Sequence, residues 1–399
     1  MANKEYCIGD LCANKPKLID DKYFILGVNL AWLDGQYDHD FGSNKIMNDL
    51  DQQNKLFDPQ KEPGHAYNPN NYKAYFGHED KNGNYQENLT ASLNLESYFN
   101  NMQGLGISVV RIWGFERFEG LSFDKVDGEN EETVKTIYKD LLTNFKSVCK
   151  LAKQYNLRLY LALIDSWGLW REDKFQEDAK KELAQRMAKL IKDPTQTRRF
   201  VENAVIPLIC DSEIKDAIFA VDIFNEPEGL VEGKGQGYSG LSWEDAVGYI
   251  NRCSEAIHEE CSDVRLSCGL QKRKSLEKVK GCQGLSFFDF HEYSDSGEIP
   301  KYSELDVKIP VIIGECGQKT EQWDDALQQK VVDKFLENTF KKGYAGCLVW
   351  NYDHPFPEKE PGHWLSLVKS DGSIRIAGDK IKKYADICKN KNINAPWVA

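Results

Sequence analysis

The 399-residue sequence contains no apolar run that approaches the length of a membrane-spanning helix, which needs roughly 20 residues. It also lacks a cluster of Lys and Arg with interleaved aromatic side chains, and its 51 basic and 63 acidic residues give a net charge of −12. We therefore expect neither a membrane nor nucleic acid as a partner. The opening MANKEYCIGDLCANKPK lacks the apolar centre of a signal peptide. We expect a secreted protein if a signal was removed ahead of this start, and a cytoplasmic one otherwise.

The cysteine spacing excludes further classes of protein. The 11 Cys are an odd number spread along the chain, and no CxxC pair or Cys/His spacing typical of zinc occurs. A complete disulfide framework like that of small secreted domains is not expected, and neither is a metal or another cofactor. Cys7 and Cys12 are close enough in sequence to form a local disulfide, whereas Cys316 and Cys347 lie in apolar segments and should be buried thiols.

What the sequence does contain is a series of short apolar runs rich in β-branched and aromatic residues, separated by amphipathic stretches. There are eight such runs, centred near Phe24, Val109, Leu161, Ala220, Leu266, Phe288, Ile312 and Leu348. Near-continuous apolar strands are typical of parallel sheets, which are covered on both faces. Eight strand-helix units predict an α/β fold, a single-domain (β/α)₈ TIM barrel, and we expect a monomer.

The connections between these runs define the expected domain limits. Residues 1–20 and 391–399 are expected to be tails, and residues 21–390 to form the barrel domain. A long first connection, about residues 32–92, should be a functional wall or lid of a cleft, since such loops are otherwise uncommon in compact domains. Amphipathic periodicity predicts helices over residues 92–106, 133–155 and 325–343.

Two carboxylates stand at the ends of apolar strands, Glu226 in DIFNEPE and Glu315 in VIIGECG. In a (β/α)₈ barrel the reactive groups project from the carboxyl ends of the strands. A single Glu at such a position is commonly just solvated or salt-bridged, but two of them, on the fourth and seventh strands, indicate a site. A carboxyl pair across a cleft suits glycoside hydrolysis, in which one group protonates the leaving oxygen and the other attacks the anomeric carbon. The two pKa values must then be pushed apart by their surroundings.

FNEPE and IIGECG, in this order, resemble the acid/base and nucleophile segments of the clan A retaining glycoside hydrolases. HEY on the sixth strand, Arg111 and Trp350 resemble family 5, the cellulase and mannanase family, and the resemblance spans roughly residues 23–383. It implies a retaining hydrolase that cleaves a neutral β-linked glycan, of the β-mannan or β-glucan type, by double displacement. Glu226 would be the general acid/base and Glu315 the nucleophile, with the carboxyl groups roughly 5 to 5.5 Å apart.

The same resemblance implies roles for five neighbours. Asn225 would bind the sugar 2-hydroxyl, and Tyr293 and Arg111 would hydrogen-bond or polarise the nucleophile. His291 would line the site, and Trp350 would be the floor on which the sugar stacks. Purely structural roles are open for four of them: Trp350 as a core aromatic, Tyr293 and His291 as a hydrogen-bonded pair, and Arg111 as a tie between strands.

The third strand departs from the family pattern. It ends ALIDSWG, so that Asp165 stands where many family 5 members have His or Asn. Asp165 would either select a hydroxyl arrangement or form an ion pair with Arg111. Trp167 follows it, and further strand-end tryptophans that would be stacking platforms or loop filling are Trp113, Trp170 and Trp364.

The first strand leads into NLAWLDGQYDHDFG, in which Trp32 and Asp34 are candidates for the non-reducing side of the cleft. The cluster Asp38, His39 and Asp40 is a weak metal-ligand pattern and would make the barrel a metalloenzyme instead. The sequence is also compatible with an inactive carbohydrate-binding barrel and with an exo-acting enzyme on β-galactosides or other β-glycosides.

Overall fold

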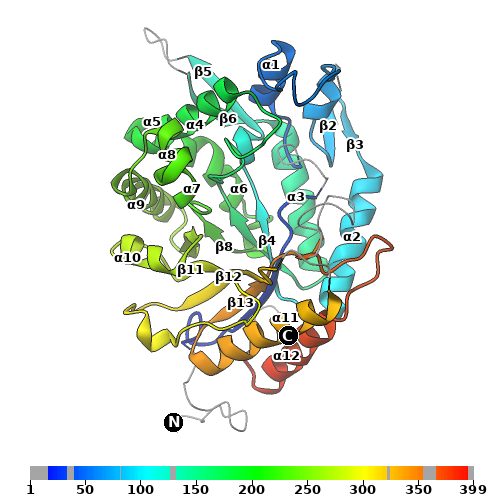
Figure 1. Ribbon diagram of the computed structural model, residues 1–399. Helices are drawn as coiled ribbons and strands as arrows, with labels where there is room; N and C mark the ends of the chain where they lie inside the picture. Colours follow the sequence, from blue (N-terminus) through cyan, green and yellow to red (C-terminus); the bar gives the residue numbers. More distant parts are fainter. Residues whose placement is uncertain are drawn as a thin grey trace.

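A closed parallel β-barrel lies at the centre of the molecule (Figure 1). It has eight staves, where a stave is one barrel position that is filled by a single strand or by two consecutive short strands. The computed structural model describes residues 17–33, 40–80, 82–125, 132–320, 324–353 and 365–393. The barrel strands are β1 (Ile25–Asn29), β4 (Val109–Trp113), β7 (Arg158–Ala162), β8 (Ile218–Asp222), β9 (Leu266–Ser267), β10 (Gly269–Leu270), β11 (Phe288–Tyr293), β12 (Val311–Gly317) and β13 (Gly346–Val349). Only Cys268 separates β9 from β10, so these two short strands form one stave and close the barrel. The predicted (β/α)₈ fold is confirmed.

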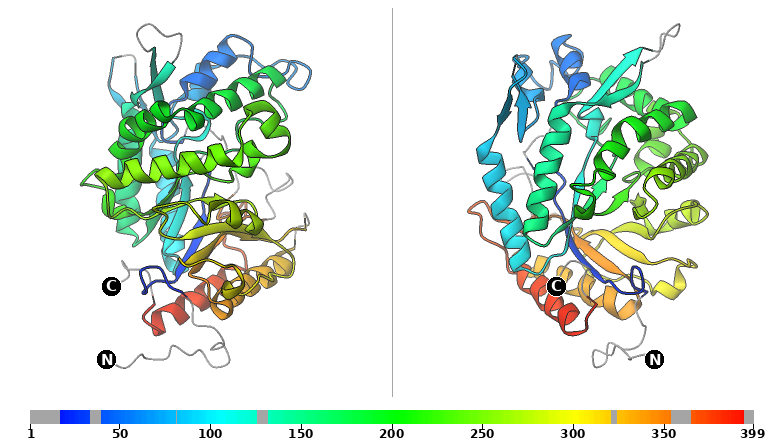
Figure 2. Two further views of the ribbon diagram at one scale, coloured as in Figure 1. Left: turned by 90° about the vertical axis from the view of Figure 1, so that its left-hand side faces the viewer. Right: turned by 180° about the vertical axis from the view of Figure 1, so that it is seen from behind.

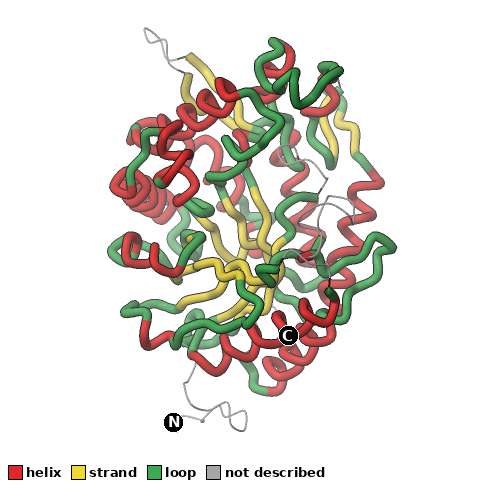
Figure 3. The backbone as a smooth tube through the Cα atoms, in the orientation of Figure 1, coloured by secondary structure: helices red, strands yellow, loops and turns green. Residues whose placement is uncertain are grey.

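Helices surround the strands on all sides (Figures 2 and 3). The longer ones are α2 (Leu89–Gly104), α3 (Lys139–Gln154), α4 (Glu177–Lys192), α9 (Trp243–Glu260), α11 (Asp325–Lys342) and α12 (Gly378–Asn390), with the shorter α5 (Pro194–Phe200), α6 (Ile206–Ile209) and α10 (Leu276–Val279). Local chemistry sets their ends. A capping box of Ser242 and Asp245 begins α9, and Gly343, at φ 90°, ends α11 in the left-handed conformation that favours glycine.

One predicted helix is partly wrong. Of residues 133–155, only Lys139–Gln154 are helical, whereas β6 (Glu132–Ile137) pairs antiparallel with β5 (Leu121–Lys125). The run TVKTI is rich in β-branched residues, which favour a strand. Val134 and Ile137 are buried, so the segment is held by packing before the helix begins.

The long first connection folds into small units of its own. It contains α1 (Lys45–Gln52), a 3₁₀ turn η2 (Pro69–Tyr72) and the hairpin of β2 (Gly77–Glu79) and β3 (Tyr85–Glu87). Phe41, Tyr72 and Phe76 are buried in it. The backbone N–H groups of Phe41 and Gly42 donate to Glu119 Oε1, which ties the connection to the segment after β4. A shorter insertion after β8 forms α7 (Glu228–Val231) and α8 (Gly233–Ser239).

The cysteines behave largely as the sequence suggests. Cys316 and Cys347 are buried and free, while Cys7 and Cys12 lie outside the described residues. One disulfide was not anticipated: Cys210 and Cys261 join the residue after α6 to the residue after α9. None of the helices in the described part of the chain is long and apolar enough to cross a bilayer.

Candidate active site

Glu226 enters the site from the turn that follows β8. Its backbone is in the left-handed region, at φ 46°, and its N–H donates to the carbonyl oxygen of Gly269 at 2.6 Å. Ser166 Oγ donates to the carbonyl oxygen of Glu226 itself. A non-glycine residue in this conformation is strained, and such strain persists where the surrounding contacts over-determine the geometry, often at functional sites.

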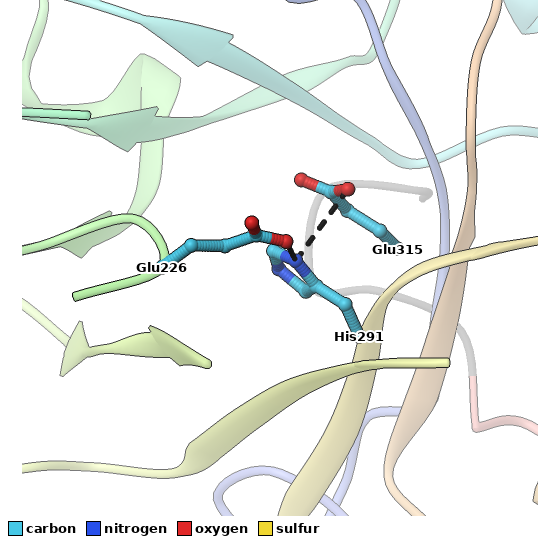
Figure 4. Close-up of side chains that lie close together, drawn as sticks. All are labelled: Glu226, His291 and Glu315. Carbon is cyan, nitrogen blue, oxygen red and sulfur yellow. Dashed lines mark hydrogen bonds and ion pairs between the residues drawn. The ribbon is translucent and has the colours of Figure 1, made fainter. Parts of the chain in front are cut away.

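The Glu226 carboxyl group lies in a buried environment that on balance favours its neutral form, although the hydrogen bond from Trp167 acts in the opposite direction. Oε1 is 2.5 Å from His291 Nδ1 (Figure 4). Trp167 Nε1 donates to Oε2. Burial raises the pKa of Glu226 to about 7, and the negative charge of Asp165 acts in the same direction. This is the environment that a general acid needs near neutral pH.

Glu315, in β12, has partners that suit an ionised carboxylate. Arg111 Nη1 donates to Oε1 at 2.8 Å, and Tyr293 Oη donates to Oε2 at 2.7 Å. Burial raises the pKa of Glu315, while the charge of Arg111 and the Tyr293 hydrogen bond oppose that rise. An oxygen of Glu226 and an oxygen of Glu315 lie within 4.8 Å of each other, and the two carboxyl groups face one another in Figure 4.

Arg111 is the centre of the buried polar network and is fully buried. Besides Glu315, its guanidinium donates to Asn29 at 3.1 Å, to Asp222 at 2.5 Å and to Asn225 at 2.6 Å. One side chain therefore both ties neighbouring strands together and pairs with Glu315. In the described part of the chain, Arg111 forms ion pairs with Asp222 and Glu315.

His291 lies between the two carboxyl groups, with Nδ1 2.5 Å from Glu226 and 3.4 Å from Glu315. Burial lowers the pKa of His291 to about 4, so the ring is neutral at neutral pH. In the part of the chain that the structure describes, Glu226, His291 and Glu315 also lie close enough together to hold a metal ion. Arg111 provides positive charge to Oε1 of Glu315, whereas His291 lies nearest to Oε2.

Three tryptophans form one wall of the site. The ring centroid of Trp350 lies 5.7 Å from that of Trp32 and 5.8 Å from that of Trp113, both in edge-to-face arrangements. Trp113 is 5% exposed and covers the Arg111 guanidinium at 4.4 Å, while Trp32 Nε1 donates to Glu116 at 2.9 Å. Trp350 and Trp32 are only partly buried and so remain available for stacking.

The cleft around these groups has a volume of about 720 Å³. Most sequence-predicted residues line it, namely Glu226, Glu315, Asn225, Tyr293, Trp350, Asp165, Trp167, Trp32 and Trp113. Arg111 and His291 support the carboxylates within hydrogen-bonding distance. Asp34, Asp38, His39 and Trp364 lie outside the described residues, and Asp40 accepts a hydrogen bond from the Leu33 N–H at 2.9 Å.

Sequence reasoning did not single out several other lining residues. These are Glu116, Arg117, Gly168, Arg171, Glu172, Asp173 and Gln271. All follow the second, third and fifth staves, so the strand-end rule could have found them had it been extended a few residues into each loop. Asp222 and Asp289, both fully buried beneath the site, were also missed.

Comparisons with known proteins agree with this geometry. The chain is 21% identical over 320 residues to a mannan endo-1,4-β-mannosidase of Cryptopygus antarcticus, covering 70% of this chain and 78% of that protein. The structure of a β-mannanase from the blue mussel Mytilus edulis superposes with a TM-score of 0.58 at 16% identity, over 91% of this chain and 92% of that one. A glycoside hydrolase family 5 mannosidase from Rhizomucor miehei, in complex with mannosyl-fructose, gives 0.54 at 12% identity, over 93% and 94%.

No family model matches the sequence. The solved structures share the barrel fold over nearly the whole chain, and the curated relative matches most of its length. Together with the paired glutamates at the carboxyl ends of the staves, they confirm the resemblance to the family 5-like retaining glycoside hydrolases of clan A.

Proposed function

We propose that this protein is a retaining glycoside hydrolase that cleaves β-1,4-linked mannan. The observation that carries the proposal is the pair of facing carboxyl groups with opposite partners. Glu226 is held by Trp167 and lies beside Asp165, whereas Glu315 is held by Arg111 and Tyr293. Oxygens of the pair lie within 4.8 Å of each other, which suits direct attack by one carboxylate better than the wider carboxyl separation of roughly 6.5 to 9.5 Å in inverting enzymes.

The reaction would proceed in two displacements. Glu226, neutral below its pKa of about 7, donates its proton to the glycosidic oxygen while Glu315 attacks the anomeric carbon. The leaving sugar departs with that proton, and an ester joins the glycosyl group to Glu315. Glu226, now ionised, takes a proton from water, and the resulting hydroxide equivalent displaces Glu315 and restores both groups.

The neighbours prepare these two steps. Arg111 and Tyr293 hold the two oxygens of Glu315 in a fixed orientation for attack. Asn225 keeps one N–H for the sugar 2-hydroxyl, because its amide oxygen is occupied by Arg111 and its other N–H by Asp165. The partly buried face of Trp350 lies at the edge of the cleft as the stacking floor.

The choice of mannan rests on the relatives, which are named as enzymes that act on mannan or on mannosides. The test is product analysis after incubation with β-mannan, β-glucan and β-galactan. We expect manno-oligosaccharides of several lengths from β-mannan, with retention of anomeric configuration by NMR and activity that persists after chelation of metals. Monosaccharide alone would indicate an exo mode, a preference for β-glucan would change the substrate, and binding without hydrolysis on all three would indicate an inactive carbohydrate-binding barrel.

We propose further that the enzyme acts as a monomer with one catalytic domain, residues 21–390, and that it is secreted to reach its polysaccharide. The N–H of Phe24 donates to the carbonyl oxygen of Ile393 at 3.0 Å, which supports a domain that joins its two ends and extends slightly beyond residue 390. Light scattering of the purified protein tests the first point, since a dimeric mass would contradict it.

A further inference from the structure

Asp165 is the departure of the third stave from the family pattern, and it is held by three N–H donors. Asn225 Nδ2 donates to its Oδ1 at 2.6 Å, while the backbone N–H groups of Trp167 and Gly168 donate to its Oδ2 at 2.8 and 2.7 Å. It is 7% exposed, and it also forms a parallel bridge with Asn225 along the backbone. An acceptor of three hydrogen bonds in this position has a structural task in the site.

The first task concerns the orientation of the Asn225 amide. Arg111 donates to Asn225 Oδ1 at 2.6 Å, and Asp165 accepts from Nδ2. A flipped amide would place its oxygen against the Asp165 oxygen and its N–H₂ against the guanidinium, which would make two repulsive contacts. The pair therefore fixes the orientation of the amide and leaves one N–H of Asn225 for a sugar hydroxyl.

The second task concerns the acid/base. The Asp165 carboxylate holds the turn that carries Trp167, and Trp167 Nε1 donates to Glu226 Oε2. Ser166, between them, donates to the Glu226 carbonyl oxygen. Three consecutive residues thus control the amide that meets the sugar, the strained backbone of Glu226 and one of its carboxyl oxygens.

We propose that Asp165 is a positioning residue, which aims one N–H of Asn225 at the sugar and holds Trp167 against Glu226, and that it does not itself select a hydroxyl. This rests on the proposed function. Through these hydrogen bonds Asp165 is linked to the amide that would meet the sugar and, by way of Trp167, to the acid/base.

The ionised carboxylate of Asp165 gives this role a measurable signature. Burial is the largest cause of the raised pKa of Glu226, and the charge of Asp165 is the second. The Trp167 hydrogen bond lowers this pKa, but by less than Asp165 raises it. The other ionisable groups that act on Glu226 or respond to it are Arg111, Arg171, Glu228, His291, Tyr293 and Glu315. A substitution at Asp165 leaves all of these in place.

The test is Asp165→Asn, which keeps the shape, removes the charge and cannot accept from both Asn225 and the turn. Losing a charge-assisted hydrogen bond should lower kcat/KM on β-mannan by roughly 10- to 100-fold. Removing a negative charge lowers the pKa of Glu226, so the alkaline limb of the pH profile should move to lower pH. Trp167→Phe keeps an aromatic ring but removes the indole N–H that lowers the pKa of Glu226, so it should move that limb to higher pH. Asp178→Asn, whose carboxylate on α4 is 98% exposed, is the matched control and should change neither quantity.

A titration of ¹³C-labelled Glu side chains by NMR, with the Glu226 signal assigned through Glu226→Gln, measures the same pKa without turnover. Wild-type protein that hydrolyses no glycan refutes the proposed function, while the NMR midpoint still tests Asp165. The positioning role is overturned if Asp165→Asn keeps kcat/KM within about twofold of wild type, or if activity falls while the Glu226 midpoint stays unchanged. If Asp165→Asn does not fold, an unchanged midpoint in Trp167→Phe overturns the link to Glu226.

Discussion

The two ends of the barrel are built from the same strands and have opposite character. Near the amino ends, a cluster of buried apolar side chains fills the interior, comprising Ile19, Ile25, Val109, Tyr160, Phe219, Ala220, Phe287, Ile312, Ala345 and Leu348. A few residues further along the same staves, the interior holds Asn29, Arg111, Asp222, Asp289, His291 and Glu315. The first layer needs nothing but close packing, whereas the second consists of groups whose burial costs free energy unless each is paired.

This difference separates stability from chemistry within one sheet. Tyr160 marks the boundary, since its ring packs in the apolar layer and its hydroxyl donates to Asp289 at 3.0 Å in the polar one. Substitutions in the polar layer should remove turnover and leave folding largely intact. Substitutions in the apolar layer should do the reverse. The following predictions test that division, from the largest expected effect to the smallest.

The largest effect is expected from Glu315→Gln. The amide keeps an acceptor for Arg111 but cannot form the glycosyl ester, so kcat on β-mannan should fall by at least about 10⁴-fold, or about 5.5 kcal/mol of activation free energy. The thermal unfolding midpoint, followed by circular dichroism, should remain near that of wild type. A variant that unfolds, or one that keeps more than a hundredth of the activity, contradicts the division at this residue.

Glu226→Ala should produce the next largest loss, about 10²- to 10⁴-fold on β-mannan, because the leaving oxygen is no longer protonated. Azide should restore turnover of an aryl glycoside with an activated leaving group and yield a glycosyl azide, since azide attacks the ester without a general base. Wild-type activity should decline as the pH rises through about 7, where Glu226 loses its proton, and this limb should be absent from the variant. Unchanged hydrolysis of β-mannan by the variant would show that Glu226 is not the acid.

In the apolar layer, Phe287→Ala should act on stability alone. Phe287 is fully buried, with its ring centroid 5.7 Å from that of Tyr160 and 5.9 Å from that of Phe219. Truncation should lower the free energy of unfolding by about 3 to 5 kcal/mol, because a cavity remains among these rings. The kcat of the folded fraction should stay within about twofold of wild type. Phe287→Leu provides a milder variant, and a large fall in its kcat at unchanged stability would break the comparison.

The sequence was informative wherever burial imposes a pattern. Parallel strands covered on both faces are continuous apolar runs, so all eight staves could be located. Glu226 and Glu315 stood out because each interrupts or ends such a run. Strand β6 was not predicted from the sequence, because its residues also fit a helical period. Antiparallel pairing with β5 makes this segment a strand rather than the start of a helix.

Other features depend on geometry that no local pattern contains. Asp222 and Asp289 lie inside strands and are informative only once Arg111 and Tyr160 are known to face them. The contacts of Asp165 depend on the turn that brings the N–H groups of Trp167 and Gly168 to one oxygen. Sequence spacing can place such residues at the right end of the barrel but cannot pair them.

The smallest effect is expected at the rim, from Trp32→Phe. This change keeps an aromatic ring against Trp350 but removes the Nε1–H that donates to Glu116. Loss of one such hydrogen bond is worth about 0.5 to 1.5 kcal/mol, so KM for β-mannan should rise roughly 2- to 10-fold while kcat and the unfolding midpoint change little. Initial rates over a range of mannan concentrations separate the two parameters. A fall in kcat comparable to that of Glu226→Ala would place Trp32 with the reacting groups, and the polar layer would then extend to the first stave's loop.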